Sequence, residues 1–168
     1  MLFVRFTILG DLVLERAVSR FADSVKDFSP VWERIRDDFH RIEEEQFETE
    51  GGRSGAPWQH LSRVTQSPGG RRHISYEEWK HKHFPGAKIL YRTGAMWGQF
   101  VTGVGMTTEI SPMRLLIQPN IPYAIYHQQG TSKMPQRRVV NLTEADKMGW
   151  MKMIKDFAFW KANEAGLR

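Results

Sequence analysis

The sequence predicts an α+β fold in which helices pack on one side of a small antiparallel sheet and a long loop leaves the body of the domain. Three observations favour this fold. Apolar residues recur at helical spacing over residues 11–25, 29–50 and 143–165. Short runs typical of strands lie between residues 100 and 118. Residues 51–90 contain glycine or proline at nine positions, which interrupt any long element.

The length and composition set outer limits. A chain of 168 residues predicts one domain over residues 1–168, large enough to bury roughly 68–70% of its unfolded surface. The absence of cysteine excludes a disulfide scaffold, thiolate zinc sites, iron–sulfur clusters and cysteine catalysis. We expect no membrane span, because the longest uncharged run, residues 115–132, contains prolines and amides. We also expect no secretory signal in the first ten residues.

The first two helices follow a short predicted strand at residues 3–8. The first helix begins near Asp11, and the second begins at Ser29-Pro30 and stops at Gly51-Gly52, which are ordinary start and stop signals. The second helix has an apolar stripe formed by Trp32, Ile35, Phe39, Ile42 and Gln46. Its other face is rich in acids, which predicts either a solvated surface or a contact with another subunit.

The remaining elements are marked by their caps. Residues 75–78 have a capping-box pattern that predicts a short helix to residue 83, and residues 143–146 have another that predicts the last helix, ending at Gly166. Strands are expected between residues 100 and 118, most clearly at 113–118 between two prolines. Residues 139–140 are expected to add one short strand.

The charge is distributed unevenly along the chain. Residues 1–50 carry 7 basic and 12 acidic side chains (−5), residues 51–140 carry 12 and 3 (+9), and residues 141–168 carry 5 and 4 (+1). This asymmetry is compatible with DNA binding, and equally with a head-to-tail contact between identical subunits.

The basic middle segment contains one mixed cluster of cations and aromatic rings. We expect its cations to lie on an exposed excursion and to contact DNA or a neighbouring subunit. These cations are Arg71, Arg72, Lys80 and Lys82. The alternative is that Tyr76, Trp79 and Phe84 simply hold a long loop against the core.

The usual catalytic signatures are missing from the sequence. There is no phosphate loop, dinucleotide fingerprint, zinc-protease motif or nucleophile elbow. A metal site at His73, His81 and His83 is disfavoured, because lysines flank the last two histidines. His127 lies among aromatic residues, as structural histidines do. We therefore expect no enzyme activity, no metal and no cofactor.

Four segments carry a resemblance to a known family. Residues 56–62 (APWQHLS), 89–96 (ILYRTGAM), 122–131 (PYAIYHQQGT) and 134–137 (MPQR) occur in this order. They resemble the "P-W-x-x-L-S", "I-L-x-x-T-G-x-L", "P-Y-A-x-x-H-Q-x-G" and "(M/I)-P-x-R" segments of the phage virion morphogenesis, or tail completion, proteins of Mu-like phages. The resemblance spans residues 57–146, just over half of the chain.

The resemblance implies a structural virion protein. It would be a tail-completion or tail-terminator subunit at the head–tail junction, assembled in the host cytoplasm as a ring, expected to be a hexamer, around the DNA channel. Its partners would be copies of itself, the tail tube protein, head connector or stopper proteins, and the phage DNA. The alternatives are another connector ring protein, an adaptor or a stopper, and a DNA-binding protein that uses the basic middle segment.

The residues of these segments have expected structural roles. Trp58 and Tyr123 should be core anchors, and Gly94 and Gly130 should stand at turns. Arg137 follows a proline and should reach a carboxylate with its fork of donors. The motif residues as a set are Trp58, Thr93, Gly94, Tyr123, His127, Gly130 and Arg137.

Overall fold

The computed structural model describes residues 12–65, 70 and 73–167. The predicted strand at residues 3–8 and the cations Arg71 and Arg72 lie outside the described residues. The elements in chain order are α1 (Leu12–Ser24), α2 (Ser29–Glu48), η1 (Gly52–Ser54), α3 (Tyr76–His83), α4 (Ala95–Trp97), η2 (Gly98–Thr102), β1 (Thr107–Ser111), β2 (Arg114–Gln118), α5 (Ala124–Gln129) and α6 (Glu144–Ala165).

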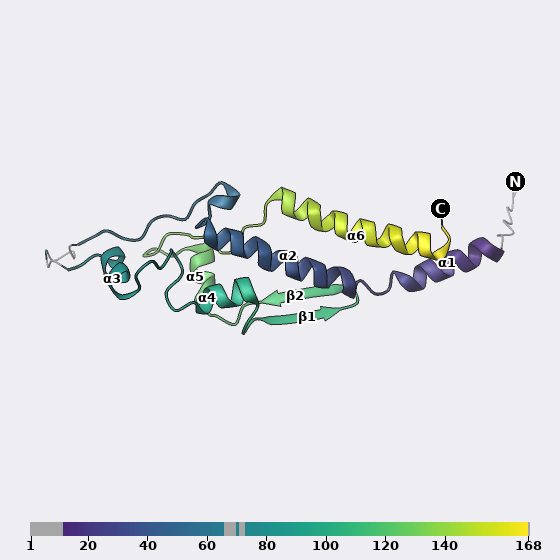
Figure 1. The fold of residues 1–168 in the computed structure, drawn as a ribbon, viewed down its shortest axis with the longest axis horizontal. Helices are drawn as coiled ribbons and strands as arrows, with labels where there is room; N and C mark the ends of the chain where they lie inside the picture. The colour runs from purple at the N-terminus through teal and green to yellow at the C-terminus, as the bar shows by residue number, and fades with distance from the viewer. Residues whose placement is uncertain (1–11, 66–69, 71–72, 168) are drawn as a thin grey trace, which may run out of the picture.

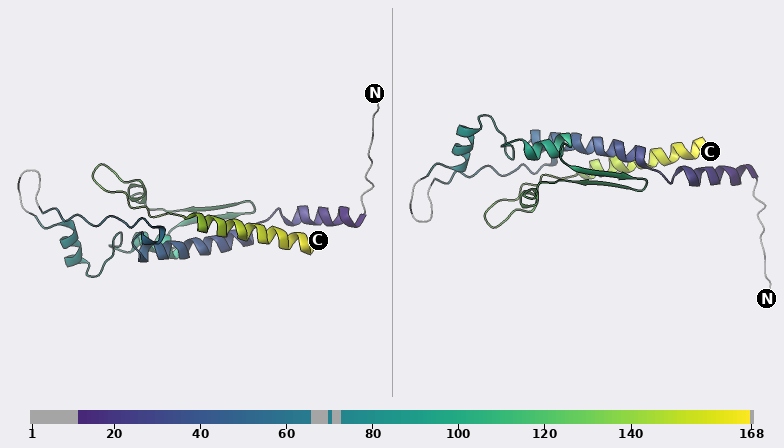
Figure 2. Two further views of the ribbon diagram at one scale, coloured as in Figure 1. Left: turned by 90° about the horizontal axis from the view of Figure 1, so that it is seen from above. Right: turned by 90° about the horizontal axis from the view of Figure 1, so that it is seen from below.

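The structure confirms an α+β fold with a small antiparallel sheet, 53% helical and 8% strand. The molecule is elongated, with α2 along its middle (Figure 1). Helix α6 runs antiparallel to α2 and contacts it, and α1 contacts α6. The β1–β2 ribbon packs on α2 (Figure 2). Helix α3 lies beyond the C-terminal end of α2, on the predicted excursion (Figure 1).

Helix α2 supplies much of the core, as its apolar stripe predicts. Its buried residues include Ile35, Phe39, Ile42 and Phe47. The helix begins at Ser29 as predicted; Phe28 is its N-cap residue, and the Asp27 carboxylate accepts a hydrogen bond from the Ser29 amide at 2.8 Å. The core around the C-terminal half of α2 consists of Phe39, Phe47, Trp58, Ile89, Met96, Phe100, Ala124 and Val139.

The ribbon matches the clearest strand prediction. Strand β2 pairs antiparallel with β1, so that Thr107 lies opposite Gln118 and Ser111 opposite Arg114. Residues 98–102, however, form a π-helical turn rather than a strand. The turn buries Phe100 against Phe47 and places its carbonyl 2.7 Å from His40 Nδ1, so tertiary packing overrides the local strand preference.

The strand expected at residues 139–140 is absent from the described structure. Val139 is buried in the core, and the Gln128 side chain binds both main-chain groups of Val140. Gln128 donates to the Val140 carbonyl (2.8 Å) and accepts from its amide (3.0 Å). A side-chain amide therefore satisfies the main-chain groups that a neighbouring strand would have paired.

Helix α6 begins and ends where the sequence predicts. Thr143 and Asp146 form a reciprocal capping box, and Gly166 is the left-handed C-cap residue. Asp146 also accepts two bonds from Arg53 (2.5 and 3.0 Å), and Arg53 donates to Glu45 at 3.0 Å. Arg53 lowers the pKa of Asp146 to about 2, because its bonds favour the ionised carboxylate. This ion cluster ties α2, η1 and α6 together.

Helix α1 forms as predicted but buries little. Ala17 is its one buried residue among those described, whereas Leu14 and Val18 are 54% and 49% exposed. Part of the apolar stripe read from the sequence therefore faces outward in the single chain, whereas Phe21 is half-buried. None of the described helices is both long and apolar enough to cross a membrane.

Candidate functional site

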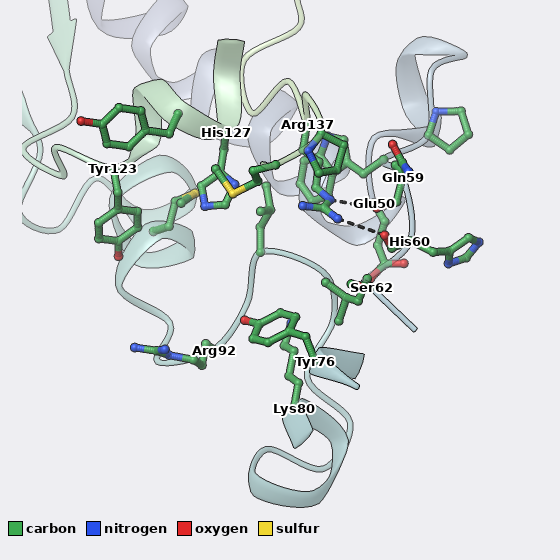
Figure 3. A pocket seen from close by; sticks show the side chains of 18 of the residues that line it. Glu50, Gln59, His60, Ser62, Tyr76, Lys80, Arg92, Tyr123, His127 and Arg137 are labelled. Atoms are coloured by element: carbon green, nitrogen blue, oxygen red, sulfur yellow. Dashed lines mark hydrogen bonds between the residues drawn. The ribbon is translucent and has the colours of Figure 1, made fainter. Parts of the chain in front are cut away.

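A cleft of about 1390 Å³ opens at the C-terminal end of α2 (Figure 3). Five parts of the chain line it: Thr49 and Glu50 just after α2, residues 57–64 after η1, one face of α3, residues 90–96, and α5 with the segment that follows it. The four segments that carry the family resemblance lie in three of these parts: residues 57–64, residues 90–96, and α5 with the segment that follows it. We refer to this site as the cleft.

Trp58 fixes the first wall of the cleft. Its side chain is 5% exposed, packs edge-to-face on Phe47 with ring centroids 5.4 Å apart, and donates from Nε1 to the Arg138 carbonyl at 2.8 Å. This confirms Trp58 as a core anchor. Gly51, at φ 86°, lies directly against the indole, since a Cβ there would be 2.6 Å from Trp58 Cδ1.

Among the residues that the structure describes, two other than glycine have left-handed backbone conformations, and both line the cleft. Glu50 has φ 49° and Leu90 has φ 60°. Each such conformation costs on the order of 1–3 kcal/mol and persists where surrounding contacts hold it. The Glu50 carbonyl accepts from Trp58 N (2.7 Å), and its carboxylate accepts from Ile89 N (2.6 Å). Glu50 therefore links the wall that contains Trp58 to the wall that follows Ile89.

Arg137 is the buried cation at the centre of the cleft. It is 6% exposed and donates to two main-chain carbonyls, from Nε to Gln59 (2.8 Å) and from Nη2 to His60 (3.0 Å) (Figure 3). The expectation that Arg137 reaches a carboxylate is wrong within the described chain, because these two carbonyls occupy its fork. Burial lowers the pKa of Arg137 from its usual value.

Lys80 corrects the prediction of an exposed basic cluster. It is 2% exposed, and its ammonium group donates to the Lys88 carbonyl. Burial lowers the pKa of Lys80 and Arg137 lowers it further, whereas Glu50 opposes the shift. Lys82 is exposed on α3, as predicted, because the helical turn places it away from Lys80.

His127 projects from α5 into the cleft wall. Its Nδ1 is buried and has no hydrogen-bond partner in the described part of the chain. Burial, and secondarily the charge of Arg137, lower the pKa of His127. This shift favours the neutral ring, and no carboxylate binds the buried Nδ1 within the described residues.

Cationic side chains dominate the lining of the cleft. Its ionisable side chains, apart from tyrosines, are Glu50, His60, Arg63, Lys80, Arg92, His127, Lys133 and Arg137. Arg63 is paired with Glu77 at 2.5 Å. Four lysine and arginine cations thus face one lining carboxylate. The sequence-level charge count indicates this region, but it does not single out Glu50, Arg92 or Lys133.

Tyrosines form the rim of the cleft. Tyr76, Tyr123 and Tyr126 are 46%, 44% and 55% exposed. Tyr123 is therefore not a core anchor, contrary to expectation: its ring meets His127 edge-on with centroids 6.4 Å apart and otherwise faces outward. Position 123 immediately precedes α5, so its side chain stays at the cleft mouth while Ala124 takes the buried position.

The structure brings the motif residues together. Six of the seven line the cleft, namely Trp58, Thr93, Gly94, Tyr123, His127 and Arg137. The seventh, Gly130, ends α5 at φ 75°, where a Cβ would lie 2.9 Å from the Gln136 amide nitrogen. Gly94 has φ 81° and is the N-cap residue of α4, so both glycines stand at turns as expected.

The cleft does not hold a group of metal ligands. Within the described residues, no three histidine or carboxylate side chains gather to hold a metal ion. No protein-family model, curated protein or solved structure matches the chain. The resemblance to the tail completion family therefore stands on its four segments.

Proposed function

We propose that this protein is a structural virion protein, a tail-completion or tail-terminator subunit that forms a ring at the phage head–tail junction. It works by assembly and makes or breaks no covalent bond. Its partners are copies of itself in a ring, proposed to be hexameric, the tail tube below, a head connector or stopper protein above, and the DNA in the channel.

The observation that carries this proposal is the amount of apolar side chain that the single chain leaves exposed. In its described part, 16 large hydrophobic side chains are between 39% and 73% exposed, whereas 13 hydrophobic residues are buried. Soluble monomers rarely expose large continuous apolar patches, and such patches mark contacts with other proteins. The exposed apolar side chains of α1 and α6, two helices in contact, are the part of this surface that favours completion by neighbouring chains.

Helix α6 shows the effect most clearly. Its 22 residues are well capped, yet Ala165 is the one buried residue among them. One face meets the body through Trp150, whose Nε1 donates to Asp38 at 2.7 Å, and through Phe157, which packs on Phe28. The opposite face exposes Met148 and Phe159, and the two flanks expose Met151 and Trp160. These apolar side chains lie among the charged residues of the exposed side, where the single chain leaves them uncovered.

Electron microscopy of isolated tails tests the proposal. Added protein is expected to form a ring on the head-proximal end of tails that lack this subunit and to restore joining to heads. The double variant Met148→Ser/Phe159→Ser is expected to lose the ring, because it removes exposed apolar contact area. Its midpoint of thermal unfolding should stay within a few degrees of the wild-type value, since surface substitutions change stability by about 0.5 kcal/mol or less.

The control is Met153→Ser, on the half-buried side of α6. It should lower the unfolding midpoint, which separates loss of folding from loss of assembly. Wild-type protein that binds neither tails nor its own copies would contradict the proposal. A ring located at a different layer of the connector would instead favour the adaptor or stopper alternative.

The cations and tyrosines of the cleft favour DNA binding as a second candidate function. Phosphate attraction combined with stacking would use such side chains, and the affinity would fall steeply with salt. Against this reading, Lys80 and Arg137 are buried and already bound to carbonyls, so they do not form an exposed basic track. Salt-dependent binding of a DNA duplex by the isolated protein would support this candidate.

The proposed role predicts no hydrolytic activity. Purified protein should leave DNA and peptide substrates intact in the presence of divalent metals, because the described residues gather no set of metal ligands and His127 has no catalytic partner. Gel and chromatographic assays of product measure this. Metal-dependent cleavage that disappears when the histidines are substituted would overturn the prediction.

A further inference from the structure

The cleft contains more positive charge than its own chain neutralises. Lys80, Arg92, Lys133 and Arg137 form no ion pair in the described structure, and Glu50 is the one carboxylate in the lining. Lys80 and Arg137 are also nearly fully buried, at 2% and 6% exposure. Buried charges in proteins are normally paired, because an unpaired one pays its desolvation cost without an opposing attraction. The cleft is therefore built for an anionic occupant.

The position of these cations favours carboxylates over a DNA backbone. Arg137 lies below the tyrosine rim with its fork bound to two carbonyls, so its charge attracts an anion that enters the cleft, while the exposed Arg92 and Lys133 are free to pair with that anion directly. A single side chain can enter such a cleft, whereas a duplex is a rigid cylinder that contacts exposed cations. The tyrosine hydroxyls at the rim also donate hydrogen bonds to carboxylates. A glutamate on an exposed helix combines sufficient length with the required charge.

The chain itself presents such a helix face. Glu33, Asp37, Glu44 and Glu48 are all exposed on α2, at spacings of four, seven and four residues. This spacing places them on one face, over about 22 Å at 1.5 Å per residue. Glu33, Glu44 and Glu48 form no ion pair in the described structure, and Arg41, which lies between them, is neutralised by Asp38 and Glu45. We refer to these four acids as the acidic stripe.

We infer that the acidic stripe of one copy docks into the cleft of the next copy. This inference rests on the proposed function for the presence of many copies at one place. The contact joins two different surfaces, so it leaves a free stripe at one end of any pair and a free cleft at the other. Such head-to-tail contacts close into a ring when the rotation between copies permits.

The lack of cysteine allows a direct test by engineered disulfides. Ser62→Cys places a thiol in the cleft lining, and Glu44→Cys places one on the stripe. Under mild oxidation at low salt, the double variant should give a ladder of covalent oligomers longer than dimers, and each single variant should stay monomeric. The matched control, Ser62→Cys/Lys155→Cys, carries its second thiol on the exposed side of α6 and should give no ladder.

Charge reversal then tests the chemistry. In the double-cysteine background, Arg92→Glu/Lys133→Glu should reduce the ladder about tenfold, and so should Glu33→Lys/Glu48→Lys. A chain carrying both reversals should recover it, because the two surfaces are again complementary. Raising ionic strength from about 0.05 to about 0.5 M should also weaken the wild-type ladder, since screening shortens the range of these attractions.

Several outcomes would overturn the inference. One is the formation of dimers by a single-cysteine variant, and another is a ladder whose yield is unchanged by either charge reversal. A third is that no variant gives a ladder while charge reversal in the cleft abolishes binding to a DNA duplex. Rings on tails without the Ser62–Glu44 disulfide would overturn the inference and leave the proposed function standing. A ladder from a protein that does not bind tails would support the inference and contradict the proposed function.

Discussion

Trp58→Ala is expected to lower the free energy of unfolding by about 3–5 kcal/mol, which approaches the whole stability of many domains. The indole is 5% exposed, packs against Phe47 and fills the space beside Gly51. Its loss leaves a cavity at the junction of α2 with the first wall of the cleft. Urea unfolding followed by circular dichroism measures the change, and Arg92 and His127 should become more accessible as the walls separate.

Two further variants separate the loss of buried packing from the loss of the hydrogen bond and from the removal of an exposed indole. Trp58→Phe keeps an aromatic ring but loses the hydrogen bond to the Arg138 carbonyl, which still accepts one from Gln46 at 3.0 Å. This variant should lower the free energy of unfolding by only about 1 kcal/mol for the lost bond, plus a smaller packing loss. Trp160→Ala removes an indole that is 54% exposed and should cost much less than Trp58→Ala. Unchanged stability in Trp58→Ala would show that the residue is not a core anchor.

The helices are the part of this fold that sequence reasoning predicts best. Helices α3 and α6 begin at the capping residues Ser75 and Thr143, whose hydroxyl oxygens accept hydrogen bonds from the amides three residues later, as the patterns predict. These signals are local, so a single chain segment contains all the information. The π-helical turn at residues 98–102 could not be predicted in this way, because its conformation depends on Phe47 and His40 in α2.

Sequence reasoning identifies many of the residues that line the cleft, but it does not show that they lie together in space. The segment resemblance selected six residues that line it, yet nothing in their spacing shows that they face one another. Arg137 binds carbonyls 77 and 78 positions earlier in the chain, and any residue type offers a carbonyl there. The burial of Lys80 could not be predicted either, because the group that accepts its hydrogen bond is the main-chain carbonyl of Lys88, which any residue type would provide.

Glu43 is the most unusual charge-bearing residue in α2. A sequence reader would group it with Glu44 and Glu45 on the acidic face, but its side chain is fully buried, and neither carboxylate oxygen has a hydrogen-bond partner in the described structure. Burial raises the pKa of Glu43 to about 8; Arg53 reduces the shift and Asp146 adds to it. The folded protein therefore holds Glu43 protonated at neutral pH.

The sign of the pH effect follows from this raised pKa. In the unfolded chain the carboxyl ionises near its model value of 4.5, while in the folded chain it stays protonated until about pH 8. The contribution of Glu43 to stability is thus fully present below about pH 4.5. It is lost progressively as the pH rises through 8, because folding then requires uptake of a proton or burial of a charge.

Glu43→Gln is expected to remove this loss, because glutamine has nearly the same shape and never ionises. The variant and the wild type should have similar unfolding free energies at pH 5, whereas at pH 8 the variant should be more stable by roughly 3–5 kcal/mol, the equivalent of the separation between the two pKa values. Chemical denaturation between pH 5 and 8.5 measures the difference, in which the titration of other groups largely cancels. Glu44→Gln, on the exposed neighbouring position, should show little pH-dependent difference from the wild type. A constant difference between Glu43→Gln and the wild type across this range would mean that Glu43 is ionised in the folded protein, with a counter-charge that stabilises it.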